Sequence, residues 1–115
     1  MKYKRSGDHY FHKIDKMPEG LKKIKHNGIF VFGTGEASNH NHIITVDKVD
    51  NLIIKQDING IFYFKLKTNG WLKHIEGNST KTADHKPIKI EPMIWRQVPE
   101  REVDIFSQTI RKVID

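Results

Sequence analysis

The sequence predicts a mostly β fold: a small single-domain β-barrel or sandwich with a short C-terminal helix. Short segments rich in β-branched and aromatic residues recur about every 8–12 residues, and turn residues separate them. An apolar pattern at helical spacing is found near the end of the chain. Because 115 residues provide for one hydrophobic core, we expect a single β-rich domain over residues 1–115.

The first half of the chain is expected to hold three strands. Residues His9 to Ile14 alternate loosely in polarity, and Met17-Pro18-Glu19-Gly20 follows as a turn. Gly28 to Gly33 is a continuous apolar run bounded by glycines, which is typical of a strand buried on both faces. Gly33-Thr34-Gly35 is then expected to form a tight turn or a bulge, and Ile43 to Val46 to form the next strand.

A hairpin is the clearest local feature of the sequence. Leu52 to Gln56 and Ile61 to Leu66 both have strand-like composition, and Asp57-Ile58-Asn59-Gly60 joins them. The Asn-Gly pair favours the positive backbone dihedrals of a tight reversal. Gly70 to Ile75 is predicted to form one more strand after this hairpin.

The last third of the chain adds two strands and the helix. Glu76 to Asp84 is a polar loop, and Pro87 to Pro92 then alternates between two prolines, as an edge or terminal strand does. Met93 to Val98 is predicted to be the final strand. Asp104 is expected to cap the helix. The apolar residues at helical spacing are Ile105, Phe106, Ile110, Val113 and Ile114.

Composition limits the classes of function. The chain has no cysteine, which excludes disulfides and thiolate metal sites. No stretch approaches the roughly 20 apolar residues of a membrane span, and no apolar run follows the basic N-terminus. We therefore expect a cytoplasmic protein, in the host cytoplasm if the gene is phage-encoded. The net charge of +6 suits a nucleic acid or phosphorylated ligand, although scattered surface lysines would give the same charge. A homodimer is compatible with the small core and an exposed strand edge.

The residues that best indicate chemistry are His40 and His42. Two histidines at i and i+2 on a strand project to the same side, so both imidazoles can bind one divalent metal ion. The residue types do not distinguish zinc, manganese, iron and nickel. Alternatively, the pair consists of two surface histidines on a loop.

Further ligands must come from other parts of the chain. Glu36 precedes the pair and is a candidate for a third ligand, for a residue that orients a ligand, or for a general base. His85 is the best candidate for a third histidine ligand, and His74 comes next. We interpret the remaining histidines as surface residues and both tryptophans as core or edge packing residues. These are His9, His12, His26, Trp71 and Trp95.

Several elements of the chain resemble a family of small, largely uncharacterised bacterial and phage proteins over nearly the full length. Ser6-Gly7-Asp8 and Met17-Pro18-Glu19-Gly20 resemble its Q-G-D-like segment and its P-x-G. Residues 35–42 resemble its GE-[VA]-TGH-x-H motif, with Ser38-Asn39 in place of Thr-Gly. Residues 82–88 resemble its H-x-E-H-x-P-I motif, and the C-terminal residues resemble its final R-x-V-x-D. The resemblance implies a site that contains His40, His42 and His85.

Two differences limit what the resemblances imply. Thr82 stands where the family motif has its first histidine, so no role is carried over to that residue. The order of an HxH pair and a later histidine is also similar to the metal site of the cupins. The cupin proline-glycine spacing before the last histidine is absent here, so this similarity is one of pattern and does not transfer a function.

Three functions remain open from the sequence. In the first, the protein is a metal-dependent hydrolase or nuclease that acts on a phosphate-containing or nucleic-acid substrate, with Glu36, His40 and His42 in the catalytic site. In the second, it is a noncatalytic nucleic-acid-binding module or a phage or defence accessory protein with structural histidines. In the third, it is a metal-free ribonuclease in which His40 or His42 transfers protons, as an imidazole of near-neutral pKa can.

Overall fold

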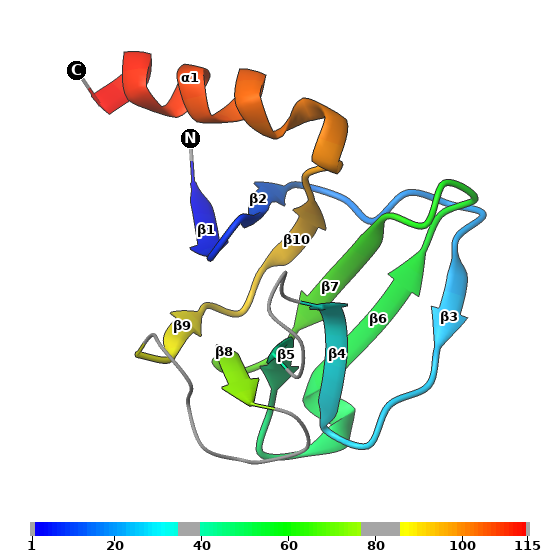
Figure 1. The fold of residues 1–115 in the computed structure, drawn as a ribbon. Helices are drawn as coiled ribbons and strands as arrows, with labels where there is room; N and C mark the ends of the chain where they lie inside the picture. Colours follow the sequence, from blue (N-terminus) through cyan, green and yellow to red (C-terminus); the bar gives the residue numbers. More distant parts are fainter. Residues whose placement is uncertain (1, 35–39, 77–85, 115) are drawn as a thin grey trace.

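Two antiparallel sheets form the layers of a sandwich, and one helix follows them at the C-terminus (Figure 1). The computed structural model describes residues 2–34, 40–76 and 86–114. The predicted mostly β class with a short C-terminal helix is confirmed. Of the two predicted architectures, the sandwich fits, since neither sheet closes into a barrel.

The larger sheet has six strands in the order β1-β2-β10-β7-β6-β3. The predicted strand from His9 to Ile14 and the predicted hairpin are confirmed, and Gly60 adopts a φ of 85° in the hairpin turn. The predicted final strand lies in the middle of this sheet, between β2 and β7. The bounds are β1 Tyr3–Ser6, β2 His9–Ile14, β3 Lys22–Ile24, β6 Leu52–Gln56, β7 Phe62–Leu66 and β10 Ile94–Gln97.

The smaller sheet has four strands in the order β4-β5-β8-β9, with bounds Ile29–Thr34, His40–Thr45, Gly70–Glu76 and Ile88–Ile90. The prediction that the first of these is buried on both faces is wrong. It is an edge strand, and Ile29 and Val31 on its outer face are 51% and 47% exposed. The tight turn or bulge predicted over residues 33–35 lies one residue earlier: the register of β4 against β5 shifts between Val31 and Gly33, whereas Gly33 and Thr34 remain paired with β5, and Gly35 lies outside the described residues. The prediction of an edge strand within residues 87–92 is confirmed by β9.

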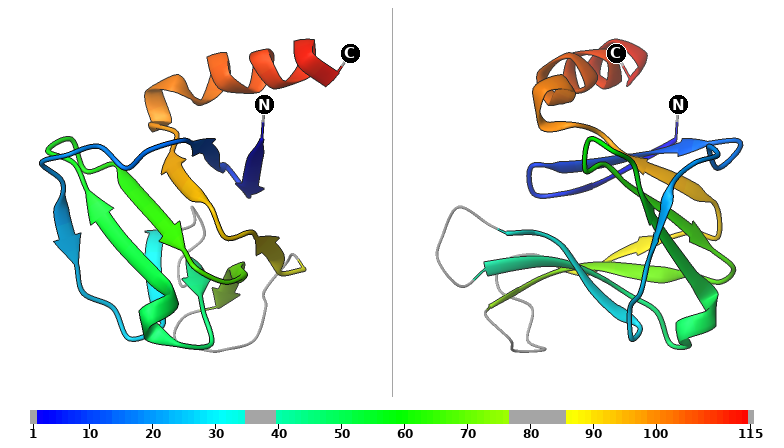
Figure 2. Two further views of the ribbon diagram at one scale, coloured as in Figure 1. Left: turned by 180° about the vertical axis from the view of Figure 1, so that it is seen from behind. Right: turned by 90° about the vertical axis from the view of Figure 1, so that its right-hand side faces the viewer.

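The core lies between the two sheets, which Figure 2 shows as stacked layers. Its fully buried members come from both layers. Trp95 is fully buried, as predicted, and its indole N–H donates to the carbonyl oxygen of Glu91 at 3.0 Å. Trp71 is 41% exposed, so of the two tryptophans only Trp95 is a core residue. The fully buried residues are Phe11, Ile44, Ile54, Phe64, Leu72, Ile90 and Trp95.

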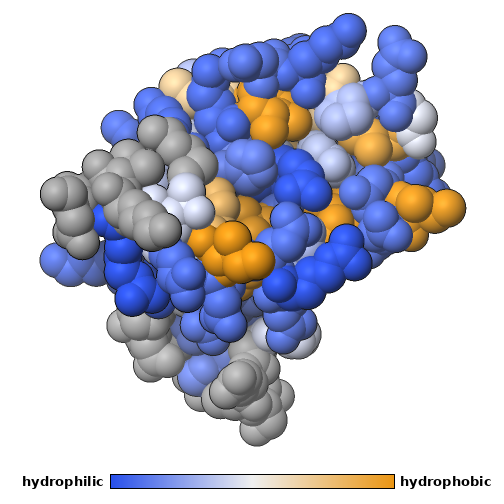
Figure 3. Space-filling view, turned by 90° about the horizontal axis from the view of Figure 1, so that it is seen from above, coloured by the Kyte–Doolittle hydropathy of each residue, from blue (hydrophilic) through white to orange (hydrophobic). Residues whose placement is uncertain are grey.

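The helix α1 (Val103–Ile114) packs on the β1–β2 end of the larger sheet through a second, smaller core. Two short 3-10 helices, η1 (Val49–Asn51) and η2 (Glu100–Glu102), precede β6 and α1. Asp104 lies inside the first turn of α1, so its predicted capping position is wrong by at least one residue. Figure 3, which looks down onto this end of the molecule, shows mostly hydrophilic side chains around separate hydrophobic patches. Within the described ranges, no helix has the length and apolar composition of a membrane span.

Candidate functional site

The inner face of the smaller sheet changes from aliphatic residues to histidines along two neighbouring strands. On β5 the side chains of Ile44 and His42 point toward the larger sheet, because every second residue of a strand faces the same way. On β8 the matching residues are Leu72 and His74. The register pairs Ile44 with Leu72 and His42 with His74, so an aliphatic pair is followed directly by an imidazole pair.

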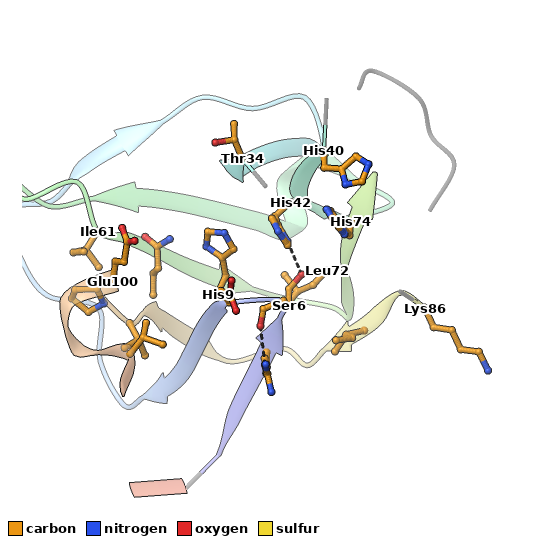
Figure 4. Close-up of a pocket in the computed structure, with 18 residues that line it drawn as sticks. Ser6, His9, Thr34, His40, His42, Ile61, Leu72, His74, Lys86 and Glu100 are labelled. Carbon is orange, nitrogen blue, oxygen red and sulfur yellow. Dashed lines mark hydrogen bonds between the residues drawn. The ribbon is translucent and has the colours of Figure 1, made fainter. Parts of the chain in front are cut away.

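Four imidazole rings from three strands gather at this end of the sandwich (Figure 4). The rings of His42 and His74 are stacked, with centroids 4.4 Å apart and planes 4° from parallel. The ring of His40 meets that of His74 edge-on at 5.0 Å. On the opposite sheet, β2 contributes His9, whose ring centroid is 4.4 Å from that of His42. We call these four residues the histidine cluster.

The backbone is shaped to admit these rings. Ser6 is buried, and its Oγ lies 3.1 Å from Nδ1 of His42. Gly7 follows with a φ of 59°, and a Cβ atom there would lie 2.9 Å from Cε1 of His42. A Cβ at Gly33 would lie 2.5 Å from Cε1 of His9. Real Cβ atoms do not approach ring carbons this closely, so both imidazoles depend on an adjacent glycine.

The cluster opens into a cavity of about 950 Å³ between the two sheets. In Figure 4, His40, His42 and His74 lie toward one end of this cavity, Ile61 and Glu100 toward the other, and His9 between them. The lining also carries formal charges of both signs. Its cations are Arg5 and Lys86, and its carboxylates are Asp8 and Glu100. With neutral histidines, the lining is therefore close to electrically neutral.

Burial keeps at least one ring of the cluster in its neutral form at neutral pH. Burial lowers the pKa of His9 from 6.5, and His74 lowers it further, while the carboxylates of Asp8 and Glu100 act in the opposite direction. His42 is 5% exposed, and both ring nitrogens of His74 are shielded from solvent. Neutral imidazole is the form that binds a metal ion or accepts a proton.

The structure brings together some of the predicted site residues. His40, His42 and His74 meet at the cavity, whereas Glu36, Thr82 and His85 lie outside the described residues. The residues His9, His12 and His26, interpreted as surface residues, are each partly exposed and partly buried. His9 joins the cluster, the ring of His12 lies 5.7 Å from that of Phe106, and Nε2 of His26 is 2.6 Å from the carbonyl oxygen of Leu52. The sequence offered one signal for the missed residues, namely the Ser6-Gly7-Asp8 element directly before His9.

The imidazole nitrogens of the cluster are suitable ligands for a transition-metal ion, but the present orientation of the rings is not suitable for binding one. Imidazole nitrogens are preferred ligands of zinc, iron and nickel. However, a metal ion lies close to the plane of each ring that binds it, and two stacked parallel rings do not aim at one point. Among the described residues, no group of three or more histidine, aspartate or glutamate side chains is arranged to hold a metal ion. Binding would therefore require a ring of the cluster to rotate.

Comparison with known proteins gives the chain a family. The model of a domain of unknown function, DUF8820, matches residues 5–99, so the chain belongs to this family. The match includes the last two residues of β1, all other strands and every residue of the histidine cluster, and it ends before η2 and α1. No curated protein and no solved structure matches the chain.

Proposed function

We propose that this DUF8820 domain binds a divalent transition-metal ion at the histidine cluster and uses it to hydrolyse a phosphate-containing substrate. The observation that carries the proposal is the convergence of four imidazoles, from three strands and both sheets, on one cavity. Packing of the core does not call for histidine at these positions, because His42 and His74 directly continue the rows of Ile44 and Leu72.

Metal binding would require a ring to rotate about its outer side-chain torsion. The outer side-chain torsion of histidine has a broad energy profile, so a ring can turn without leaving a deep minimum. Further candidate metal ligands precede His40 and follow His74 in the sequence. Residues 35–39, which include Glu36, lead directly into His40, and residues 77–85, which include His85, follow the strand that carries His74. Glu36 as general base and His85 as a further ligand remain predictions.

A divalent ion in the cavity would supply Lewis acidity and a nucleophile derived from water near neutral pH. The chain itself would supply binding and orientation. Ser6 holds His42 by its Nδ1 atom, which leaves Nε2 of the same ring as the ligand atom. Since the formal charges of the lining balance, a divalent ion would make the cavity attractive to an anion, and Lys86 and Arg5 are the cationic side chains of the lining that could contact it.

Metal binding can be tested on the purified protein. We expect close to one equivalent of zinc, manganese, iron or nickel by elemental analysis, and stabilisation by about 2.7 kcal/mol at a metal concentration 100 times the Kd. His42→Ala and His74→Ala should abolish both effects. His12→Ala is the matched control, because this histidine lies on β2 with its ring against Phe106. Absence of bound metal together with absence of a thermal shift for all four metals would refute the proposal.

A second candidate function is favoured by the stacked arrangement of His42 and His74 and by the neutral form of His9. In this alternative, the histidines act without metal as the acid and base of a ribonuclease. The same preparations separate the two functions. Cleavage of RNA that persists in chelator and disappears in His40→Ala or His42→Ala supports the metal-free reaction. Cleavage that chelator abolishes and one of the four metals restores supports the metal-dependent hydrolase.

A further inference from the structure

The outer face of the smaller sheet carries a half-exposed tryptophan beside lysines. Alternate residues of each strand point away from the core, since Phe30, Ile44 and Leu72 point into it. The strand register aligns the outward residues in three rows across the sheet, and the row of Thr34, Asn41 and Ile75 is the one nearest the histidine cluster. The other two rows are Ile29, Thr45, Trp71 and Lys89, and Val31, Ile43 and Lys73. We call these seven residues the outer face.

Part of the outer face is open to solvent. Trp71 is 41% exposed and Ile29 in the same row is 51% exposed, whereas Ile43 in the second row is buried. Figure 2 shows that the larger sheet and α1 lie on the inner side of the smaller sheet. No described helix or strand therefore covers the outer face. Exposed indole and aliphatic side chains on one face of a sheet are typical of a surface that contacts a partner.

We propose that the outer face binds single-stranded nucleic acid, with a base stacked on Trp71 and backbone phosphates near Lys73 and Lys89. Lys89 lies directly across from Trp71, and Lys73 lies two residues further along the strand of Trp71. The seven residues include two lysines and no acidic residue, and the chain carries a net charge of +6. Stacking on an exposed aromatic ring combined with lysine–phosphate contacts is how sequence-tolerant binders hold single strands.

The charges favour this partner over a second copy of the chain. A two-fold contact between two outer faces would place the lysines of one copy close to those of the other, and like charges across an interface oppose association. The inference goes beyond the proposed hydrolase, because the outer face lies on the side of the sheet opposite the histidine cluster. It needs neither a metal ion nor a reaction.

Intrinsic fluorescence gives a direct test with the full chain. The two tryptophans are Trp71 and Trp95, and Trp95 is fully buried, so quenching by a bound base reports on Trp71. We expect an oligothymidine of about ten nucleotides to quench the fluorescence at low salt, within the site sizes of comparable binders. A duplex of the same length should not quench it, since its bases are already stacked on each other.

Variants assign the binding to the outer face by anisotropy of a labelled oligonucleotide. Trp71→Leu should weaken binding by about 5-fold or more, whereas Trp71→Phe should keep most of it. Lys73→Gln with Lys89→Gln should reduce the slope of log affinity against log salt by about 1.4. The matched control is Lys22→Gln with Lys23→Gln, which removes the same charge from β3 at the edge of the other sheet. This control should leave most of the slope intact, and thermal unfolding confirms that each variant is folded.

Several outcomes would overturn the inference. These are the absence of quenching at low salt, full binding by folded Trp71→Leu, and an equal loss of salt dependence in the two lysine pairs. Self-association that Trp71→Leu abolishes, without any binding of the oligonucleotide, would identify a second copy as the partner instead. All oligonucleotide measurements are made in chelator, where no metal ion is available to the histidine cluster, so failure of the proposed metal site and failure of this inference are distinguishable.

Discussion

Replacing Gly7 by alanine tests whether the backbone is shaped around His42. Gly7 has a φ of 59°, and a Cβ atom there would lie 2.9 Å from Cε1 of His42, 3.5 Å from Nε2 and 3.9 Å from Nδ1. Since ordinary contact begins near 3.4 Å, the ring must move by about 0.5 Å. The ring has little room to move, because it is 5% exposed and is stacked on His74.

Gly7→Ala should lose stability for two reasons, the cost of positive φ in the backbone and the displacement of the His42 ring. Gly20→Ala measures the first of these alone. Positive φ costs an alanine about 1–2 kcal/mol, and the reduced freedom of the unfolded chain returns about 0.4–1 kcal/mol. Displacement of a packed ring adds about 1–3 kcal/mol. Gly20 is the control, since its φ is 79° and a Cβ atom there would meet nothing within 4 Å. Gly20→Ala should therefore cost about 0–1.5 kcal/mol, and Gly7→Ala about 1–3 kcal/mol more.

Urea unfolding in chelator measures both variants without a contribution from bound metal. If the cluster binds a metal ion, Gly7→Ala should also weaken that binding by about 10-fold or more, because Cε1 lies between the two ring nitrogens. Gly20→Ala should leave the metal affinity unchanged. Equal unfolding free energies for the two variants, to within about 0.5 kcal/mol, together with equal metal affinities, would refute the view that Gly7 is needed for the position of His42.

Two further predictions concern the residues that surround the same ring. Ser6→Ala removes the hydroxyl that lies 3.1 Å from Nδ1 of His42, and it should destabilise the protein by about 1 kcal/mol in urea unfolding. If His42 is a metal ligand, the same variant should also bind the metal ion more weakly. An unchanged unfolding free energy together with an unchanged metal affinity would contradict the role of Ser6 in holding the ring. The second prediction concerns pH. Because burial lowers the pKa values of His9 and His12 from 6.5, the unfolded chain binds more protons than the folded chain just below pH 6.5. The unfolding free energy in chelator should therefore fall as the pH falls below 6.5, and the fall should be shallower in His9→Gln; a stability that rises over this range would contradict the lowered pKa values.

Local sequence patterns predict most strands of this fold because turn residues separate them. The Asp57–Gly60 turn places its hairpin correctly, and Gly33 directly follows the bulge of β4. The two strands that were not predicted, β1 and β3, lie at the two edges of the larger sheet. Both are short and contain two basic residues each, and an edge strand of this kind lacks the alternating apolar residues by which a strand is recognised.

The error in β4 has a different cause. A continuous apolar run predicts burial on both faces only if another layer covers each face, and the run itself does not contain that information. Here the outward side chains of Ile29 and Val31 have no described layer above them. The same limit applies to Trp71, whose exposure depends on which strands flank β8 and not on its own neighbours in sequence.

The histidine cluster shows what local spacing can predict and what it cannot. The pairing of His40 with His42 follows from the two-residue period of a strand, and the fold confirms that both line one cavity. The approach of His9 follows from the stacking of the two sheets, which brings together residues more than 30 positions apart. No periodic pattern within one strand contains that contact.

The choice of residues at this end of the sandwich is difficult to explain by stability alone. Leucine or isoleucine at positions 42 and 74 would extend the rows that Ile44 and Leu72 begin, and buried imidazoles lose solvation that aliphatic side chains do not need. A domain of this size has little stability to spare. Two glycines adjacent to the rings add to the cost, because Gly7 and Gly33 increase the freedom of the unfolded chain. A ligand that binds the folded cluster and not the unfolded chain would offset these losses, and a metal ion is a ligand of that kind for neutral imidazoles.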